Sequence, residues 1–389
     1  QDQLTKVELD SVERGLKPFP TEPGNEPRSV TNVAWVIPSG VAMEPEPLAS
    51  IAIGQSDVFT HYVKPAIYGE AYTLGFSELS NPVQLLFGSF DLSFVCIYLL
   101  PLLVLAFSYN IFSSEKESGA LKLISAQPVS LYHWLLQRVL FRFFIISAIV
   151  IVAITVSFII YQVDITSSMG SFLQLLSLLL IYLLFWFMVA FLINLRGKSS
   201  GHNAVTLVAI WLIVVLLVPS FKSQLATHLN PVPSRIEMIH KYRVASNEAR
   251  ERADEILEDY LRDHPELAPK DTTQESRYTW MLTYFTSSDV VNQTIRPIVN
   301  EYDAALSSQQ AWVDKLRFIS PATLLQNGLN DIAGTSTAHY VDFRKQVIAF
   351  ATIWKDYFKE RMFANELMRA NEIDQLPEPT YSGGKVPNK

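Results

Sequence analysis

The chain has 389 residues, of which 49% are hydrophobic and only 18% charged, and its formal net charge is −7. Residues 85–220 hold six Lys or Arg and four Asp or Glu, so most of the charge lies in the two flanking segments. This distribution excludes a purely soluble enzyme, and the acidic balance excludes a nucleic-acid-binding protein with a basic face. The single cysteine, Cys96, excludes a disulfide framework and a cysteine metal cluster.

The first segment, residues 1–84, contains nine prolines and no sustained helical period. Short β-like pieces such as SVTNVAWVI and LASIAIG are separated by proline and glycine residues. We therefore predict a small, irregular and partly stranded lobe. The same proline content would also fit a disordered segment, and the sequence alone allows both interpretations.

Four apolar stretches follow in residues 85–220, each near the length that crosses a ~30 Å hydrocarbon core as a helix. A soluble helix seldom carries apolar residues on every face, so four such runs in succession predict a transmembrane domain. The predicted spans are at about 85–109, 139–161, 172–195 and 204–218. The expected fold class is therefore an all-α integral membrane protein.

Lys and Arg residues in the connections between the spans predict the orientation of the chain. Basic side chains occur between the first and second spans and between the third and fourth, whereas the connection QVDITSSMGS contains none. These basic residues are Lys116, Lys122, Arg138, Arg142, Arg196 and Lys198. We predict that the loop at 110–137 is cytoplasmic and that residues 1–84 and 221–389 are both extracytoplasmic. Since such a chain needs a further span at each end, we expect six spans in the intact protein.

Residues 221–389 are polar, and their pattern predicts a helical extracytoplasmic domain. Ser234 with Glu237 forms one capping box ahead of a helix, and Thr272 with Glu275 forms another.

Later signals divide the same domain further. Pro297 is expected to kink or interrupt the second of these helices. Ser320 before Pro321 predicts a helix start, and Gly334 predicts a helix end. Apolar residues then recur at four- and three-residue steps along a last helix, at Phe343, Val347, Phe350, Trp354 and Phe358. Such a stripe is typical of core packing, and a ligand-binding groove is the alternative.

Few residues could carry chemistry. No H-E-x-x-H pattern or paired histidine on a helix face predicts a metal site. The sequence RGKSS at 196–200 lacks the first glycine of a phosphate-binding loop, because Leu192 occupies that position. Asp91 is the acidic residue within a predicted span. It either has a structural role, such as capping a short interfacial helix, or lines a substrate path.

The segment SYNIFSSEKESGALKLISAQPVSLYHWLLQRVLFR, at 108–142, mixes apolar and charged residues in a way that predicts an amphipathic helix at the cytoplasmic surface. Such a helix either lies among lipid headgroups or docks into a soluble partner.

Part of this segment, SSEKESGALKLISAQPVS, resembles the signature of ABC-2-type transporter permeases. In that signature an acidic residue precedes a Gly-Thr-Leu-like triplet and a Gln-Pro or similar turn, and Ala120 stands where the family usually has threonine. The stretches NPVQLLFGSFDLSFVCIYLLPLLVLAFSYNIFSSEKESG and SPATLLQNGLNDIAGTSTAHYVDFRKQV are similar to a subfamily with a large outer domain of unknown function. The resemblance runs from about Asn81 to Val347.

The resemblance implies a permease subunit of an ATP-driven exporter in the bacterial cytoplasmic membrane. Such permeases work as dimers, here with a second copy or a paralogue, and bind cytoplasmic ATPase subunits. The positions that match the motif, and that would couple the chain to the ATPase, are Glu115, Gly119, Leu121, Gln127 and Pro128. The chain would then bind no cofactor and perform no bond chemistry, since the partner uses the ATP and Mg²⁺.

Two other classes of function fit the sequence less closely. A large helical outer domain would also suit a membrane-anchored scaffold or a sensor that binds a ligand outside the cell. A membrane-embedded enzyme would need ionisable or nucleophilic groups gathered at membrane depth, and the sequence offers no such cluster.

Overall fold

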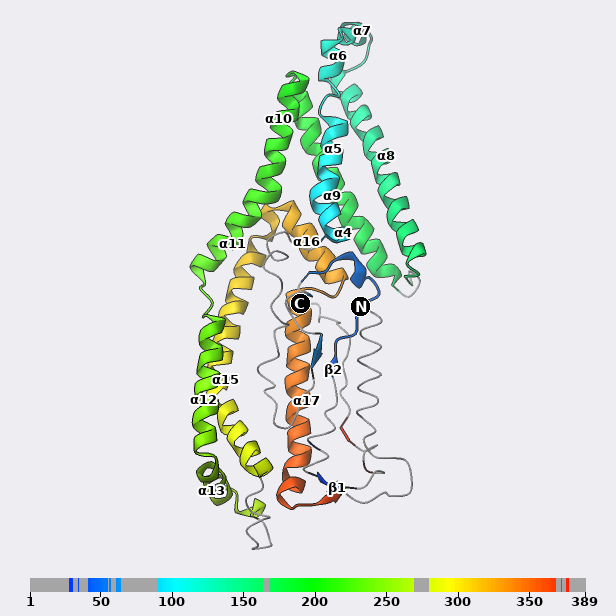
Figure 1. The fold of residues 1–389 in the computed structure, drawn as a ribbon. Coiled ribbons are helices and arrows are strands. Elements are labelled where there is room, and N and C mark those ends of the chain that lie inside the picture. The colour runs from blue at the N-terminus through cyan, green and yellow to red at the C-terminus, as the bar shows by residue number, and fades with distance from the viewer. Residues whose placement is uncertain are drawn as a thin grey trace.

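The computed structural model describes residues 28–30, 34, 41–54, 56, 61–63, 90–163, 168–268, 280–368, 372 and 376–377. In Figure 1 these residues form an elongated molecule. One end is the span bundle, which we define as helices α4 to α11, and the other is the C-terminal domain, helices α12 to α17. Helix α16 of the C-terminal domain packs against the span bundle (Figure 1).

Within the described residues, four helices are long and apolar enough to cross a membrane, namely Leu92–Glu117, Leu131–Ile160, Met169–Leu195 and Ser200–Leu229. The first span combines α4 (Leu92–Phe94), the π-helix η2 (Val95–Leu99), α5 (Leu100–Ser108) and α6 (Ser113–Glu117). The next two are α8 (Leu131–Ile160) and α9 (Met169–Leu195). The fourth combines α10 (Ser200–Trp211), the π-helix η3 (Leu212–Leu217) and α11 (Val218–Leu229). The predicted all-α membrane fold with four visible spans is confirmed.

The helices extend beyond the predicted spans. Helix α8 begins at Leu131 rather than near 139, and the fourth span continues past Pro219 to Leu229. Hydropathy reports only the part of a helix that is apolar, whereas the backbone hydrogen bonds continue into the polar flanks. Pro219 lies inside this continuous helix, directly after the π-helix η3, where the backbone hydrogen-bond pattern is already irregular. The predicted start of the first span, at 85–89, lies outside the described residues.

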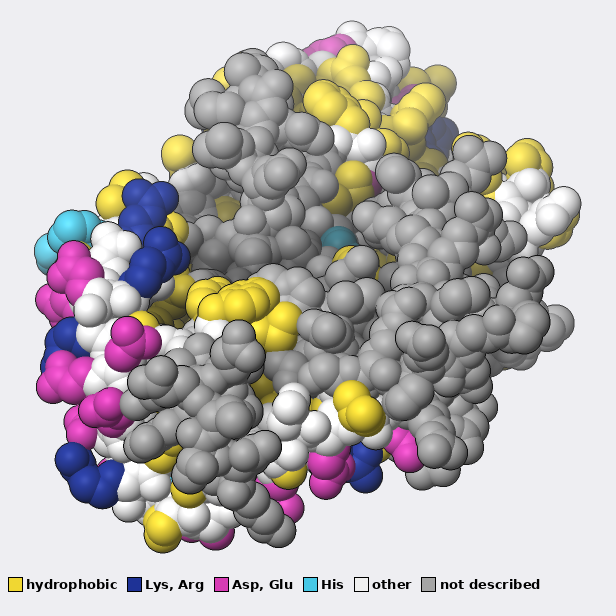
Figure 2. Space-filling view, turned by 60° about the horizontal axis from the view of Figure 1, so that its bottom comes forward, with side chains coloured by type: hydrophobic (Ala, Val, Ile, Leu, Met, Phe, Trp, Pro, Cys, Tyr) yellow, Lys and Arg dark blue, Asp and Glu magenta, His cyan; other side chains and the backbone are white. Residues whose placement is uncertain are grey.

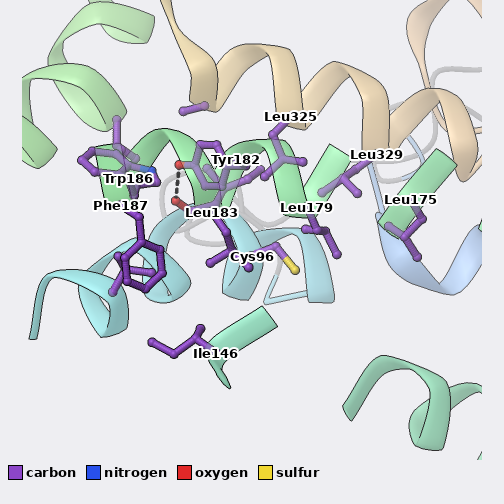
Figure 3. Close-up of a cluster of buried hydrophobic side chains, with 14 of the residues drawn as sticks. Cys96, Ile146, Leu175, Leu179, Tyr182, Leu183, Trp186, Phe187, Leu325 and Leu329 are labelled. Atoms are coloured by element: carbon purple, nitrogen blue, oxygen red, sulfur yellow. Dashed lines mark hydrogen bonds between the residues drawn. The ribbon is translucent and has the colours of Figure 1, made fainter. Parts of the chain in front are cut away.

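Helix α9 is the centre of the span bundle, because it packs against α5, α8, α10 and α16. Figure 3 shows its buried side chains facing Cys96 of the first span and Leu325 and Leu329 of α16. The Tyr182 hydroxyl donates a hydrogen bond of 2.9 Å to the Ile97 carbonyl. Since Ile97 lies in η2, this bond gives a partner to a carbonyl in the irregular turn of the first span.

The C-terminal domain is a set of long helices that pack side by side. Helices α12 (Arg235–Glu251) and α13 (Ala253–Asp263) both pack against α15 (Trp280–Lys315), and α17 (Thr337–Phe363) follows α16 (Pro321–Ile332). Short 3₁₀ turns, η4 (Pro265–Leu267) and η5 (Arg317–Ile319), occupy two of the connections.

Helices α12 and α16 begin where the sequence predicts. Helix α12 begins directly after Ser234, although the Ser234 side chain makes no capping bond. The Ser320 side chain caps α16 by accepting from the Thr323 amide, and Gly334 after α16 has a φ of +69°, as expected for a helix end. The capping box at Thr272 and Glu275 lies outside the described residues.

Pro297 lies inside α15, and the helix continues through it. The predicted interruption does not occur, and a kink is the remaining predicted effect.

The apolar stripe of α17, from Phe343 to Phe358, is buried, and the Trp354 side chain is completely enclosed. It forms a core with α13, α15 and residues of the N-terminal segment, including Val30 and Met43. The prediction of core packing is therefore confirmed.

The described parts of the N-terminal segment are short. Strand β1 (Arg28–Ser29) pairs antiparallel with β4 (Leu367–Met368), and β2 (Val41–Ala42) pairs antiparallel with β3 (Tyr62–Val63). A 3₁₀ turn, η1 (Ala49–Ile51), follows β2. These pieces agree with a partly stranded lobe, and most of residues 1–84 lie outside the described residues. Of the described residues, β1 and the buried Val30, Val41 and Met43 pack with the C-terminal domain, whereas Leu48, Ile51 and Ala52 pack with the span bundle.

Candidate functional site

The residues that match the permease motif lie at the end of the span bundle that is remote from the C-terminal domain (Figure 1). Helix α6 ends at Glu117, and α7 (Ala120–Ser125) begins after a turn at Gly119. Gly119 has a φ of +82°, which lies in the left-handed region of backbone conformation that residues with a Cβ rarely adopt. Among the described residues, no heavy atom lies within 4 Å of the place a Cβ would take. The backbone conformation, not a lack of space, therefore requires glycine here.

Helix α7 and the turn after it form an exposed surface with apolar side chains. Leu123 is 74% exposed and Val129 is 46% exposed, and Gln127 and Pro128 between them are exposed as well. Leu121 is half-buried. Apolar side chains this exposed are typical of a surface that a partner protein or lipid headgroups cover.

Glu115 connects α6 to the second span. Its carboxylate lies 2.8 Å from the Arg138 guanidinium, which in turn lies 4.5 Å from the centre of the Trp134 ring. Arg138 and Trp134 are both on the first turns of α8, so the ion pair and the ring stack hold this guanidinium from two sides. The pair is partly exposed to solvent, and it is therefore a modest link.

Glu117 connects α6 to the fourth span. Its carboxylate accepts hydrogen bonds from the Ser200 amide at 2.7 Å and the Ser200 hydroxyl at 2.8 Å. The Ser200 hydroxyl also lies 2.8 Å from the Ser113 hydroxyl. Because Ser200 is the first residue of α10, the Glu117 carboxylate satisfies a free amide at a helix N-terminus, where the helix dipole favours an anion.

Further bonds connect the same region to the turn between α9 and α10. The Lys116 ammonium donates to the Gly197 carbonyl at 2.7 Å. The Asn194 side chain accepts from the Phe112 amide at 3.1 Å and donates to the Ser108 carbonyl at 2.8 Å, so it bridges the break between α5 and α6. Asn194 is fully buried, which makes these bonds costly to lose.

Helix α6, residues Ser113–Glu117, therefore acts as a hub, and we call it the α6 hub. It continues the first span, and its side chains bind the second span, the fourth span and the turn that joins the third to the fourth. The sequence pointed to Glu115 through the permease motif and to Lys116 as a positive-inside residue, but it gave no role to Glu117 or Asn194. Ser200, the partner of Glu117, lies 83 residues away along the chain, and no local sequence pattern indicates a contact over that separation.

Asp91 lies near the opposite end of the first span. One carboxylate oxygen accepts from the Phe94 amide at 2.7 Å and the Ser93 hydroxyl at 2.6 Å, which makes Asp91 the N-cap of α4. The other oxygen accepts from the Ile53 amide at 2.9 Å. This carboxylate thus fixes the start of the first span and ties it to the segment after η1. A role in a substrate path stays a prediction.

Among the residues that the structure describes, no group of three or more His, Cys, Asp or Glu side chains is placed to hold a metal ion. Cys96 is a buried free thiol within the apolar span bundle.

Comparison with known proteins identifies one part of the chain. Residues 235–382 match a family model described as a domain of unknown function, DUF3526. The match begins at the first residue of α12 and includes α12 to α17, and it includes none of the four spans. Neither the curated proteins nor the solved structures gave a match. The molecule is therefore a helical protein with four candidate membrane spans and a DUF3526-like C-terminal domain.

Proposed function

We propose that this chain is the membrane permease subunit of an ABC-2-type exporter, driven by ATP hydrolysis in a separate cytoplasmic subunit. The observation that carries the proposal is the α6 hub. The segment that resembles the permease signature lies at one end of the span bundle, is bonded to the second and fourth spans, and exposes α7. The DUF3526 match adds support, since it falls on the region that resembles the outer domain of such permeases.

We further propose that the α6–α7 end is cytoplasmic and that the N-terminal lobe and the C-terminal domain are extracytoplasmic, in a bacterial inner membrane. The basic residues Lys116, Lys122, Arg138 and Lys198 all lie at the α6–α7 end, as the positive-inside rule requires. The C-terminal domain lies at the other end of the molecule (Figure 1).

In the proposed mechanism, α7 seats on the ATPase subunit, and closure of the ATPase dimer displaces α6. The Glu115 and Glu117 contacts then pass this displacement to the second and fourth spans, which shifts the bundle between two packings. The chain makes a dimer with a second permease copy or a paralogue. Only the partner subunit would use ATP and Mg²⁺, and this chain would catalyse no bond chemistry itself.

Co-purification tests the docking step directly. The full chain would be co-expressed with the ATPase encoded beside it, recognised by its phosphate-binding loop. Leu123→Asp places a charge on the exposed face of α7 and should abolish recovery of the ATPase with the chain. Leu367→Asp is the matched control, because Leu367 is also exposed, at 60%, but lies in β4 at the other end of the molecule. Equal recovery with both variants would contradict docking through α7.

The alternative is a membrane-anchored scaffold or sensor. Under that function no ATPase would depend on α6, so Glu115→Gln and Gly119→Val would leave ATP hydrolysis by any co-purified subunit unchanged. Under the exporter function, both substitutions should uncouple hydrolysis while membrane insertion stays intact.

A further inference from the structure

A cavity of about 360 Å³ lies in the C-terminal domain, between α12 and α13 on one side and the first turns of α15 on the other. Its volume is in the range of pockets that bind small molecules. Neither the residues that match the permease motif nor the α6 hub line it.

The floor of the cavity is apolar. It includes Ala249 of α12 and Val291 of α15, which are both buried and belong to a small hydrophobic cluster. The nearby Ser287 hydroxyl already donates to the Thr283 carbonyl at 2.7 Å. Ala249 and Val291 therefore offer van der Waals contact to a ligand, and polar side chains such as Ser246, Ser288 and Asn292 also line the cavity.

The α15 side of the cavity presents aromatic rings. Trp280 is 60% exposed and Tyr284 is 41% exposed, and they lie one helical turn apart on the same side of α15. Exposed aromatic faces next to an apolar floor favour an aromatic or aliphatic group of a ligand.

The opposite side presents one charge of each sign. Arg250 near the end of α12 and Asp254 at the start of α13 both line the cavity, on either side of the helix break at Arg252. Within the described part of the chain, the structure records no ion pair for either side chain. By contrast, Arg252 between them pairs with Glu255. Figure 2 shows basic and acidic side chains interspersed along the edge of the molecule where α12 and α13 lie.

We propose that this cavity binds a small zwitterion that carries an apolar group, which is the chemistry of a short peptide with free ends. The Arg250 guanidinium would take the ligand carboxylate, and the Asp254 carboxylate would take its ammonium group. The apolar side chain would lie between the aromatic rings of α15 and the floor. This inference does not rest on the exporter function, since a peptide site would serve an exporter or a sensor equally.

Calorimetric titration of the detergent-solubilised full chain with the dipeptide alanyl-phenylalanine tests the proposal. We expect saturable binding to one site. Acetylation of the amino group or amidation of the carboxyl group should each weaken binding roughly tenfold or more, because each removes a charge-assisted contact. The absence of binding, or equal binding of the free and blocked dipeptides, would overturn the proposal.

Matched variants assign each contact. Arg250→Gln should weaken binding of the free dipeptide but not of the amidated one, and Asp254→Asn should weaken binding of the free dipeptide but not of the acetylated one. Both side chains are exposed, so neither substitution should unfold the domain. Arg262→Gln, on α13 outside the cavity, is the control and should change nothing. If Arg250→Gln weakened the free and the amidated dipeptide equally, the guanidinium would not contact the carboxylate, and the assignment would be wrong.

Discussion

The two ends of the molecule are held together in different ways. At the α6–α7 end, polar contacts between residues far apart in sequence, such as Glu117 with Ser200 and Lys116 with Gly197, add to the apolar packing of the span bundle. In the C-terminal domain, a buried aromatic stripe on α17 packs against its neighbours over a large area. Directional contacts can transmit a displacement and then break, whereas an extended core resists change. The difference would suit the coupling role that we propose for the α6–α7 end.

The largest effect is expected at the centre of the rigid core. Trp354 is fully buried, so Trp354→Ala should destabilise the C-terminal domain by roughly 3–5 kcal/mol. Hydrogen exchange should show lost protection in α17 and also in β1, because the N-terminal lobe shares this core. Protection within the span bundle should not change. If β1 kept its protection while α17 lost it, the lobe and the domain would be independent units.

A smaller effect is expected at the α6–α7 turn. Gly119→Val forces a β-branched residue into the left-handed region, at a cost of roughly 1–2 kcal/mol, which should displace α7 and lower coupled ATP hydrolysis. Ala120→Thr is the control, because it introduces at the next position the residue that is usual in the permease signature this segment resembles. Hydrolysis should stay unchanged in the control. Equal rates in the two variants would show that the turn geometry does not matter.

Asp91 should give a small effect if its role is structural. Asp91→Ala removes the cap of α4 and should cost about 1 kcal/mol or more, whereas Asp91→Asn keeps the capping oxygen but loses the acceptor for the Ile53 amide and should cost less than the alanine variant. Thermal unfolding of the purified chain measures both. Loss of transport by Asp91→Asn without loss of stability would instead indicate a role in the substrate path.

Much of the fold could be predicted because the relevant signals are local. Hydropathy located the four spans, and the four- and three-residue spacing of Phe343, Val347 and Phe350 identified the core face of α17. Ser320 and Gly334 marked helix ends because capping depends on neighbouring residues.

The rest could not be predicted, because it depends on contacts between distant segments. Nothing near Glu117 indicates that its carboxylate caps α10, and nothing near Arg28 indicates that it pairs with Met368. The family motif directed attention to Glu115, whose partner is a nearby arginine on the next helix. The cavity between α12, α13 and α15 likewise exists only once three helices have packed.

The most direct test of the central claim is the rate of ATP hydrolysis by the purified complex of this chain, carrying Glu117→Ala, with the proposed ATPase subunit. This substitution removes both bonds to Ser200 at the start of the fourth span while leaving the exposed α7 surface intact. We predict that the ATPase still co-purifies but that its stimulation by the permease is lost, and that Lys198→Gln, an exposed control in the neighbouring turn, behaves as the wild type. Full stimulation with Glu117→Ala would contradict the role of the α6 hub in coupling.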